Sequence, residues 1–324
     1  MSEALVSVED LRVTFNSARP VHAVNGVSFA LSRGEVLCIL GESGSGKSVT
    51  LKTLLRINPE RRSTTSGRVS VAGQDVLALS GKALADYRGG TASMIFQDPM
   101  LALDPVYTIG DQIAEAVTRH KAVSRKDAME QALRMLERVR IPSPERRLKV
   151  YPHEMSGGMR QRAMIALALA CGPKLLLADE PTTALDATVQ IQILLLLREL
   201  QRELGMAAIF VTHDIGVAVE VADKIAVMYA GQFVETGSVR DVIRDARHPY
   251  AKGLLAANLH GVRKGERLDA IPGAPPALHE RPKVCAFAPR CRYAEPRCTE
   301  APPPEVTLRD GRMVRCILAE PTTV

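Results

Sequence analysis

The stretch GESGSGKSVT, residues 41–50, places three glycines within six residues, and then a lysine and a serine, directly behind the apolar run at residues 36–40. Glycine costs backbone entropy, so a cluster of glycines indicates a backbone that another group must approach closely. The apolar run predicts a buried strand, and residues 49–57 predict a helix. A glycine-rich loop between a strand and a helix is typical of a phosphate-binding site.

The loop matches G-x-x-x-x-G-K-[ST] at every fixed position. In such a loop the backbone N–H groups wrap phosphate oxygens, and the next helix offers its positive end. Lys47 would reach the β- and γ-phosphates, and Ser48 would hold Mg²⁺. A flexible turn that matches by chance is the alternative, but the strand and helix flank the loop on the correct sides. The predicted nucleotide contacts here are Gly41, Glu42, Ser43, Gly44, Ser45, Gly46, Lys47, Ser48 and Val49.

Composition narrows the class of protein. The 324 residues suggest one large domain with additions, or two domains, and 46% hydrophobic residues can form a sizeable core. Aromatic residues make up 4% and Trp is absent, which disfavours a single-strand nucleic-acid binder that stacks bases. A net charge of +6 fits either a mildly basic cytosolic protein or contact with a nucleotide or an anionic membrane face.

Two features bear on cellular location. Residues 1–10 lack a basic start followed by an apolar run, so no secretory signal is expected. The longest apolar stretches, near residues 164–171 and 191–197, are shorter than the ~18 residues that a membrane span needs. We expect a cytoplasmic protein that would need an integral partner to work at a membrane.

Strand and helix patterns alternate along the chain. Residues 5–40 have a β-rich pattern, and residues 68–79 predict one or two short strands. This alternation predicts an α/β fold with a parallel sheet. The later helices are predicted at residues 107–140, 158–171, 187–204 and 215–222, and the later strands at 174–179 and 207–212.

The predicted apolar strand at residues 174–179 ends in two adjacent acids, Asp179 and Glu180. Asp179 at the strand end suits a residue that organises Mg²⁺. Glu180 could orient or polarise an attacking water. Two ordinary surface acids are the alternative, which the phosphate loop makes the weaker interpretation.

A second helix start also offers backbone donors. Ser156 is a good N-cap, and Gly157 and Gly158 expose N–H groups beside it. Because the first loop already binds phosphates, a second such site needs either two ligands or two chains that share ligands.

These motifs, in this order, resemble an ABC-transporter ATP-binding subunit over residues 5 to about 237. The resemblance implies a P-loop NTPase with a RecA-like core, an N-terminal antiparallel β region and a helical subdomain at about 98–159. It also implies a head-to-tail dimer, in which the Ser156–Met159 signature closes on the partner's ATP. Met155 stands where Leu is usual, a conservative exchange.

The resemblance assigns roles residue by residue. Gln97 would sense the transmembrane partner, His213 would lie near the γ-phosphate, and residues 184–186 would form the D-loop. Phe15 would stack on adenine, although an aromatic in an alternating strand can equally be a core residue. The implied catalytic residues are Glu180, His213 and Gln97; the implied Mg²⁺ ligands are Ser48, Gln97 and Asp179; the further nucleotide contacts are Phe15, Gln97, Ser156, Gly157, Gly158, Asp179 and Asp186.

Three segments narrow the resemblance, at residues 96–105, 151–154 and 248–250. They are similar to segments of dipeptide, oligopeptide and nickel importer ATPases. This implies an inner-membrane complex with a second, homologous ATPase, two permeases and an extracytoplasmic solute-binding protein. Peptides, glutathione and nickel complexes all remain open as solutes. A soluble ABC ATPase acting on nucleic acid or ribosomes, and a module that binds ATP without turnover, are the other hypotheses.

The chain is predicted to divide into residues 1–262 and a tail at 263–324, because nine of its twenty prolines lie between 272 and 304. This predicts a linker and a loop-rich extension. Cys38 and Cys171 fit core positions, whereas the four other cysteines cluster in the tail without C-x-x-C spacing. The resemblance implies a [4Fe–4S] cluster, and zinc or no metal stays open. The predicted ligands are Cys285, Cys291, Cys298 and Cys316, with Arg290, Arg292 and Arg297 either offsetting thiolate charge or forming a solvated basic loop.

Overall fold

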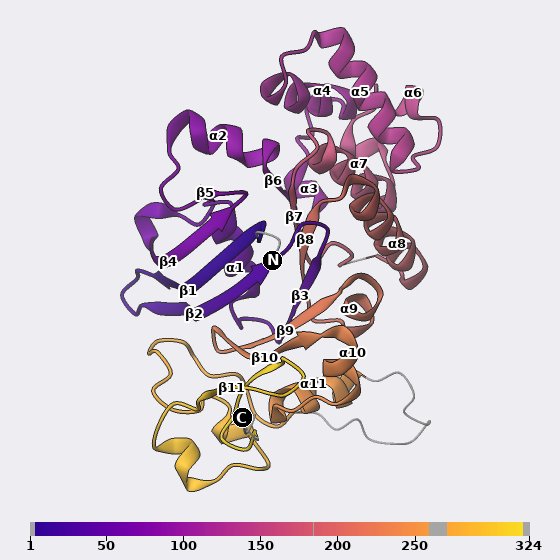
Figure 1. Ribbon diagram of the computed structural model, residues 1–324. Helices are drawn as coiled ribbons and strands as arrows, with labels where there is room; N and C mark the ends of the chain where they lie inside the picture. Colours follow the sequence, from indigo (N-terminus) through magenta and orange to yellow (C-terminus); the bar gives the residue numbers. More distant parts are fainter. Residues whose placement is uncertain (1–3, 184, 259–270, 320–324) are drawn as a thin grey trace. The chain divides into compact units, whose positions relative to one another are not determined.

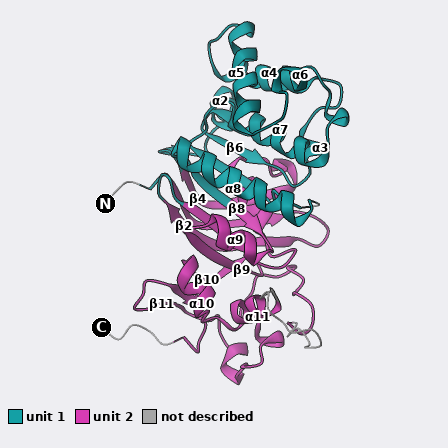
Figure 2. Cartoon of the chain, turned by 90° about the vertical axis from the view of Figure 1, so that its right-hand side faces the viewer, with its two compact units in different colours: residues 1–5, 32–35, 71–209 teal, residues 6–31, 36–70, 210–324 magenta. Residues whose placement is uncertain are grey.

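The computed structural model describes residues 4–183, 185–258 and 271–319 (Figure 1). These residues form two compact units, which Figure 2 colours separately. Unit 1 comprises residues 1–5, 32–35 and 71–209, and unit 2 comprises residues 6–31, 36–70 and 210–324. The predicted domain boundary at 262–263 and Ala184 of the predicted D-loop lie outside the described residues.

Unit 2 contains the predicted antiparallel β region. Strand β1 (Val6–Phe15) pairs with β2 (Val21–Leu31), and β4 (Ser63–Val71) lies on the other side of β1. Alternate apolar residues of β1 are buried, which is the period of a strand with one covered face. The register shifts near Asp10, whose φ is 46°.

A second sheet in unit 2 begins at the strand before the phosphate loop. Strand β3 (Val36–Leu40), buried at all five residues, runs parallel to β9 (Lys224–Tyr229). Strand β10 (Gln232–Ser238) pairs antiparallel with β9. On its other side β10 pairs antiparallel with β12, which in turn pairs antiparallel with β11. None of the strands after residue 212 was predicted from the sequence. The last two, β11 (Glu305–Thr307) and β12 (Met313–Arg315), make part of the tail sheet rather than loop.

Helices and short turns complete unit 2. The predicted helix behind the phosphate loop is α1, which begins at Lys47 and ends at Leu54. The other elements are η1 (Glu60–Arg62), α9 (Ile215–Val221), α10 (Val239–Arg244), α11 (Pro249–Asn258), η3 (Ala288–Arg290) and η4 (Pro296–Thr299).

Unit 1 has a buried parallel strand pair. Strands β6 (Ala92–Ile95) and β7 (Leu175–Asp179) are buried at every residue, as expected for a parallel sheet covered on both faces. The predicted strand at 207–212 is β8 (Ala207–Thr212), whose last three residues belong to unit 2. The remaining elements before the helical region are β5 (Gln74–Asp75) and α2 (Gly81–Gly90).

The helical region of unit 1 packs α4, α5 and α7 together. The predicted helical stretch at 107–140 is two helices, because Ser124 caps a new helix by accepting a hydrogen bond from the Asp127 N–H. The helix bounds are α3 (Pro99–Ala102), α4 (Ile109–His120), α5 (Arg125–Arg138), α6 (Pro144–Arg147), η2 (Pro152–Glu154), α7 (Gly157–Leu169) and α8 (Ala187–Leu204). Among the described residues, no helix combines the length and apolarity needed to cross a membrane.

Candidate nucleotide site

The phosphate loop of unit 2 is shaped by its glycines. Gly46 has a φ of 104°, and a Cβ there would lie 2.3 Å from the Ala23 carbonyl oxygen. A Cβ on Gly41 would lie 2.2 Å from the Met228 carbonyl oxygen. Both positions therefore exclude a side chain, which answers why the sequence concentrates glycine here. Gly44 and Ser43 are exposed at the tip of the loop.

Polar groups line the inside of this loop. Lys47 Nζ donates to the carbonyl oxygens of Gly41 and Glu42, both at 2.8 Å, so the lysine lies back along the loop. The buried Ser45 hydroxyl has no hydrogen-bond partner among the described residues. Helix α1 begins directly behind at Lys47 with Gly46 as its N-cap. A buried orphan hydroxyl, a lysine and a helix N-terminus together suit a phosphate group.

In unit 1 the predicted residues Gln97 and Glu180 come together. Gln97 Nε2 donates to Glu180 Oε2 at 3.3 Å, and Thr183 Oγ1 donates to the same oxygen at 3.0 Å. Gln97 follows β6 and Glu180 follows β7, and parallel strands end at the same edge of a sheet. Glu180 has a φ of 46°, a left-handed conformation that costs backbone energy and is often found at functional positions.

Asp179 is the last residue of β7 and directly precedes Glu180 in the sequence. Its side chain is buried. The main chain just beyond it is held by the amide of the buried Gln161, which donates to the Pro181 carbonyl oxygen. Helix α7 thus fixes the chain that carries the two acids. A buried carboxylate at a strand end is the environment expected for a residue that organises a metal ion.

The predicted second anion site also lies in unit 1. Ser156 caps α7 by accepting a hydrogen bond from the Met159 N–H at 3.4 Å, and the Ser156 side chain is exposed. A Cβ on Gly158 would lie 3.1 Å from Val189 Cγ1, so the start of α7 packs against the start of α8. Asp186 caps α8 through the Val189 N–H at 3.0 Å. Asp186 therefore has a helix-capping role whatever else it contacts.

The positions of His213 and Phe15 give less information about their predicted roles. His213 is exposed and immediately follows β8, and Asp214 behind it caps α9. Phe15 is half-buried at the end of β1, where it pairs with Val21. Whether Phe15 contacts adenine stays a prediction.

Sequence reasoning missed a connection between the loop and the tail. Arg290 donates to both carboxylate oxygens of Glu42, at 2.7 and 3.0 Å, and the Tyr250 hydroxyl accepts from the Glu42 N–H at 2.9 Å. The suggestion that Arg290 offsets thiolate charge was therefore wrong, because its guanidinium is engaged with a carboxylate. The two residues are 248 positions apart, and no sequence signal links them.

The four tail cysteines gather around one small cavity, which His248 and Phe287 also line. The Cys298 and Cys316 Sγ atoms accept backbone N–H groups from Glu295 and Leu318, each at 3.4 Å. Burial, and then the nearby thiols, raises the pKa of three of these cysteines, so as free thiols they stay protonated at neutral pH. These three are Cys285, Cys291 and Cys316.

Among the described residues, the predicted iron–sulfur ligands do not form a finished metal site. Within residues 4–183, 185–258 and 271–319, no three or more His, Cys, Asp or Glu side chains are arranged to hold a metal ion. The predicted donors are therefore neighbours around a cavity rather than a formed site. His248 at the same cavity has its pKa lowered to about 3 by burial, so its ring is neutral.

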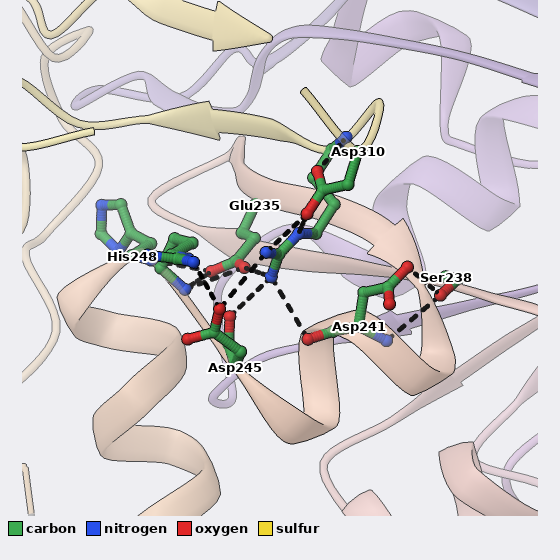
Figure 3. Close-up of polar contacts among 8 residues, drawn as sticks. Glu235, Ser238, Asp241, Asp245, His248 and Asp310 are labelled. Carbon is green, nitrogen blue, oxygen red and sulfur yellow. Dashed lines mark hydrogen bonds and ion pairs between the residues drawn. The ribbon is translucent and has the colours of Figure 1, made fainter. Parts of the chain in front are cut away.

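The second half of the tail is fastened by a buried charge network (Figure 3). Arg312, 4% exposed, donates to Asp310 Oδ2 at 2.7 Å and to the Asp241 carbonyl oxygen at 3.2 Å. Its guanidinium lies 3.7 Å from the fully buried Glu235, which accepts the His248 N–H at 2.8 Å. Figure 3 shows Glu235, Asp245 and Asp310 gathered at this one place.

Comparison with known proteins agrees with this arrangement of motifs. Residues 24–183 match the ABC transporter family, and residues 234–298 match the C-terminal region of oligopeptide/dipeptide transporters. The dipeptide transport ATP-binding protein DppD of Bacillus subtilis is 46% identical over 320 residues, which cover 98% of this chain and 96% of DppD. The oligopeptide transport ATP-binding protein OppD of Escherichia coli is 48% identical over 316 residues, covering 97% of this chain and 93% of OppD.

Solved structures show the same fold. An ATP-binding cassette, MJ0796, in a dimeric post-hydrolysis state with ADP and Pi, has a TM-score of 0.65 and 28% identity, covering 72% of this chain and 99% of that chain. The cbiO1 protein of Clostridium perfringens, part of an ABC transporter complex, has a TM-score of 0.64 and 28% identity, covering 75% of this chain and 92% of its own. The predicted α/β P-loop fold is thus confirmed, and the chain belongs to the ABC-transporter ATPase family, in the group that carries the oligopeptide/dipeptide transporter C-terminal region.

Proposed function

We propose that this chain is the ATP-hydrolysing subunit of a membrane importer for dipeptides or oligopeptides. The observation that carries the proposal is the complete phosphate loop together with a C-terminal region of the peptide-transporter type. Relatives named for dipeptide and oligopeptide transport match nearly the whole chain. Nickel and glutathione importers are the alternatives within the same family.

Each predicted site residue has a proposed role toward ATP. Backbone N–H groups of residues 43–48 and Lys47 bind the phosphates, whereas the Glu42 N–H is already donated to the Tyr250 hydroxyl. Phe15 stacks on the adenine. Ser48, Gln97 and Asp179 hold Mg²⁺, which neutralises charge that develops on the phosphates. Glu180 orients the attacking water and accepts its proton, with Gln97 holding the carboxylate in place. His213 completes the surroundings of the γ-phosphate.

A second ATPase chain supplies the signature motif. The exposed Ser156 and the N–H groups of Gly157 and Gly158 close on ATP bound to the partner's loop, and Asp186 lies at the same interface. The partner is a homologous, different chain. ATP binds the closed dimer more tightly than the open one, so ATP shifts the pair toward closure and hydrolysis resets it.

The permeases dock on a surface of exposed apolar residues that follows β6. Leu101 is 87% exposed and Val106 is 70% exposed, although both side chains are apolar. Apolar surface of this kind marks an interaction site. Docking here places the chain at the cytoplasmic face of the cell membrane, as a peripheral subunit bound to two permeases. The docking surface consists of Phe96, Met100, Leu101, Val106 and Tyr107.

Replacing Leu101 by aspartate tests this surface. We expect at least a tenfold loss of affinity for the permeases, because a charge would be desolvated at the centre of the contact. The thermal midpoint of the isolated chain should change by less than about 2 °C, since Leu101 contributes little to its core. Permease binding is measured by co-purification and titration, with Val123→Asp in the loop before α5 as the matched control. Equal losses in both variants would contradict docking at this surface.

The solute is tested by reconstitution. The chain, its partner ATPase and the permeases are placed in vesicles with the solute-binding protein, and ATP turnover is measured with dipeptides, oligopeptides, glutathione and nickel. We expect peptides to stimulate turnover and to accumulate inside. Stimulation by nickel alone, or by glutathione alone, would show that the chain belongs to a nickel or a glutathione importer instead. Co-purification with nucleic acid in place of permeases would contradict the importer proposal.

We propose further that the four tail cysteines hold a metal centre, with [4Fe–4S] preferred over zinc. Their approach to one cavity and the N–H groups aimed at two sulfurs support this donor set. Such a centre would stabilise the folded tail, because this segment has little hydrophobic core of its own. Its binding releases the thiol protons that burial retains, so loading should improve as pH rises.

The metal proposal predicts a direct analytical result. Protein purified without oxygen should contain iron and sulfide and absorb visible light, and Cys298→Ser should lose both. Cys38→Ser, at a buried strand position outside the tail, should keep them. Zinc in stoichiometric amount would favour a zinc site over the [4Fe–4S] cluster. Metal-free protein that still assembles and hydrolyses ATP would contradict the proposal of any metal centre.

A further inference from the structure

The second residue of the phosphate loop is held by the cysteine-rich tail. Arg290 and Glu42 form a bidentate ion pair at 2.7 and 3.0 Å, and the Arg290 side chain is only 5% exposed. Two parallel charge-assisted hydrogen bonds fix geometry as well as charge. Both residues belong to unit 2, so this contact lies within one compact unit.

Arg290 is itself held firmly in place. Its Nε donates to the Pro272 carbonyl oxygen at 2.7 Å, and its guanidinium lies 5.8 Å from the ring centroid of Tyr229. Its backbone lies in the turn η3, where the Ala288 N–H donates to the Cys285 carbonyl oxygen at 3.1 Å. The position of the guanidinium therefore depends on how the cysteine segment is folded.

The Glu42 main chain is held by a second side chain of unit 2, that of Tyr250. The Tyr250 hydroxyl accepts the Glu42 N–H at 2.9 Å. Tyr250 packs against Tyr229 and Phe287 with ring centroids 4.5 and 5.4 Å apart. Phe287 immediately precedes η3, so one aromatic cluster joins the tail to the start of the loop.

The charge of Glu42 gives this contact its chemical consequence. Lys47, whose Nζ contacts the Glu42 carbonyl oxygen, is the cation that the loop offers to phosphates. A free carboxylate on the same loop would repel the triphosphate and would compete for Lys47. Paired with Arg290, the carboxylate is neutralised and turned toward the tail.

We propose that Arg290 is a positioning residue for nucleotide binding: it neutralises and orients Glu42, so that the tail forms part of the support of the phosphate loop. The inference rests on the proposed binding of ATP at residues 41–48. A purely structural staple is the competing explanation, and the two differ in the effect of charge. If Arg290 only fastens the tail, then losing either partner should matter equally. If Arg290 neutralises Glu42, then losing Arg290 alone should weaken ATP binding more than losing the Glu42 charge, because only the first change leaves an unpaired carboxylate beside the phosphates.

The experiment compares single and double substitutions in the assembled ATPase. Arg290→Ala should raise the KM for ATP about tenfold, with kcat changed less than twofold. Glu42→Gln should change KM less than threefold, and the Glu42→Gln/Arg290→Ala double variant should recover to within about threefold of wild type. Arg290→Lys, which keeps the charge but not the bidentate geometry, should give an intermediate KM. Lys283→Ala, which removes an exposed positive charge from the same tail, is the matched control.

Each outcome decides the matter. An unchanged KM in Arg290→Ala, or a double variant as impaired as Arg290→Ala, overturns the proposal. If Arg290→Ala does not fold, Arg290→Gln and Arg290→Lys supply the same comparison, and wild-type KM in both overturns it. A wild-type protein that fails to bind ATP would instead refute the nucleotide site itself, so the two failures are distinguishable.

Discussion

Glutamine in place of Glu180 should lower ATP turnover by at least about a hundredfold and leave ATP binding intact. The carboxylate accepts hydrogen bonds from Gln97 and Thr183 at 3.3 and 3.0 Å, which aim it at one place beyond the end of β7. A general base contributes ~10²- to 10⁴-fold to such a reaction. The amide keeps the size of the side chain but cannot accept the proton of water.

The measurement separates chemistry from binding. Phosphate release under single-turnover conditions reports the chemical step, and titration with a fluorescent ATP analogue reports binding. Glu115→Gln, on the exposed side of α4, removes one carboxylate from unit 1 without approaching β7 and should retain full turnover. A Glu180→Gln enzyme with more than a tenth of wild-type turnover would show that another group activates the water.

The sequence could predict those parts of the site that depend on local chemistry. Gly46 and Lys47 stand in a motif whose function follows from backbone shape, so the loop and its helix were predicted correctly. Glu180 could be selected as a candidate from the sequence because it follows an apolar strand, and the structure confirms that strand as β7. Its contact with Gln97 could be understood once the parallel pairing of β6 and β7 was known, since that pairing brings both residues to one edge.

The remaining contacts depend on tertiary packing between distant segments. The pair formed by Glu42 and Arg290 joins residues in one unit that are 248 positions apart, and neither position is unusual for a charged residue. Strand β12 was missed because its three residues acquire strand geometry by pairing with β10. A short strand at a sheet edge has little local signal, since its stability comes from its neighbour.

Arg312→Ala should have the largest effect on stability, lowering the free energy of unfolding by about 3 to 5 kcal/mol. Glu235 is fully buried, and Arg312 lies 3.7 Å from it with only 4% exposure. Removing one partner of a buried pair leaves an uncompensated charge in the interior, which costs about that much. Arg315→Ala, whose ion-pair partner Glu305 is more than half exposed, should cost less than about 1 kcal/mol. Urea unfolding of the purified chain measures both.

The pH dependence shows whether the buried charge is the cause. Burial raises the pKa of Glu235 in the folded protein, and Arg312 opposes that shift, so Arg312→Ala should raise this pKa further. A carboxyl group with a raised folded pKa binds protons more tightly in the folded state, so the free energy of unfolding increases as pH falls through that pKa. The deficit of Arg312→Ala should therefore be smaller at pH 5 than at pH 7.5. Glu235→Gln/Arg312→Met should recover much of the loss at pH 7.5, because neither partner is then charged. A deficit that is equal at both pH values and persists in the double variant would mean that Arg312 stabilises this segment through its contacts with Asp310 and the Asp241 carbonyl alone.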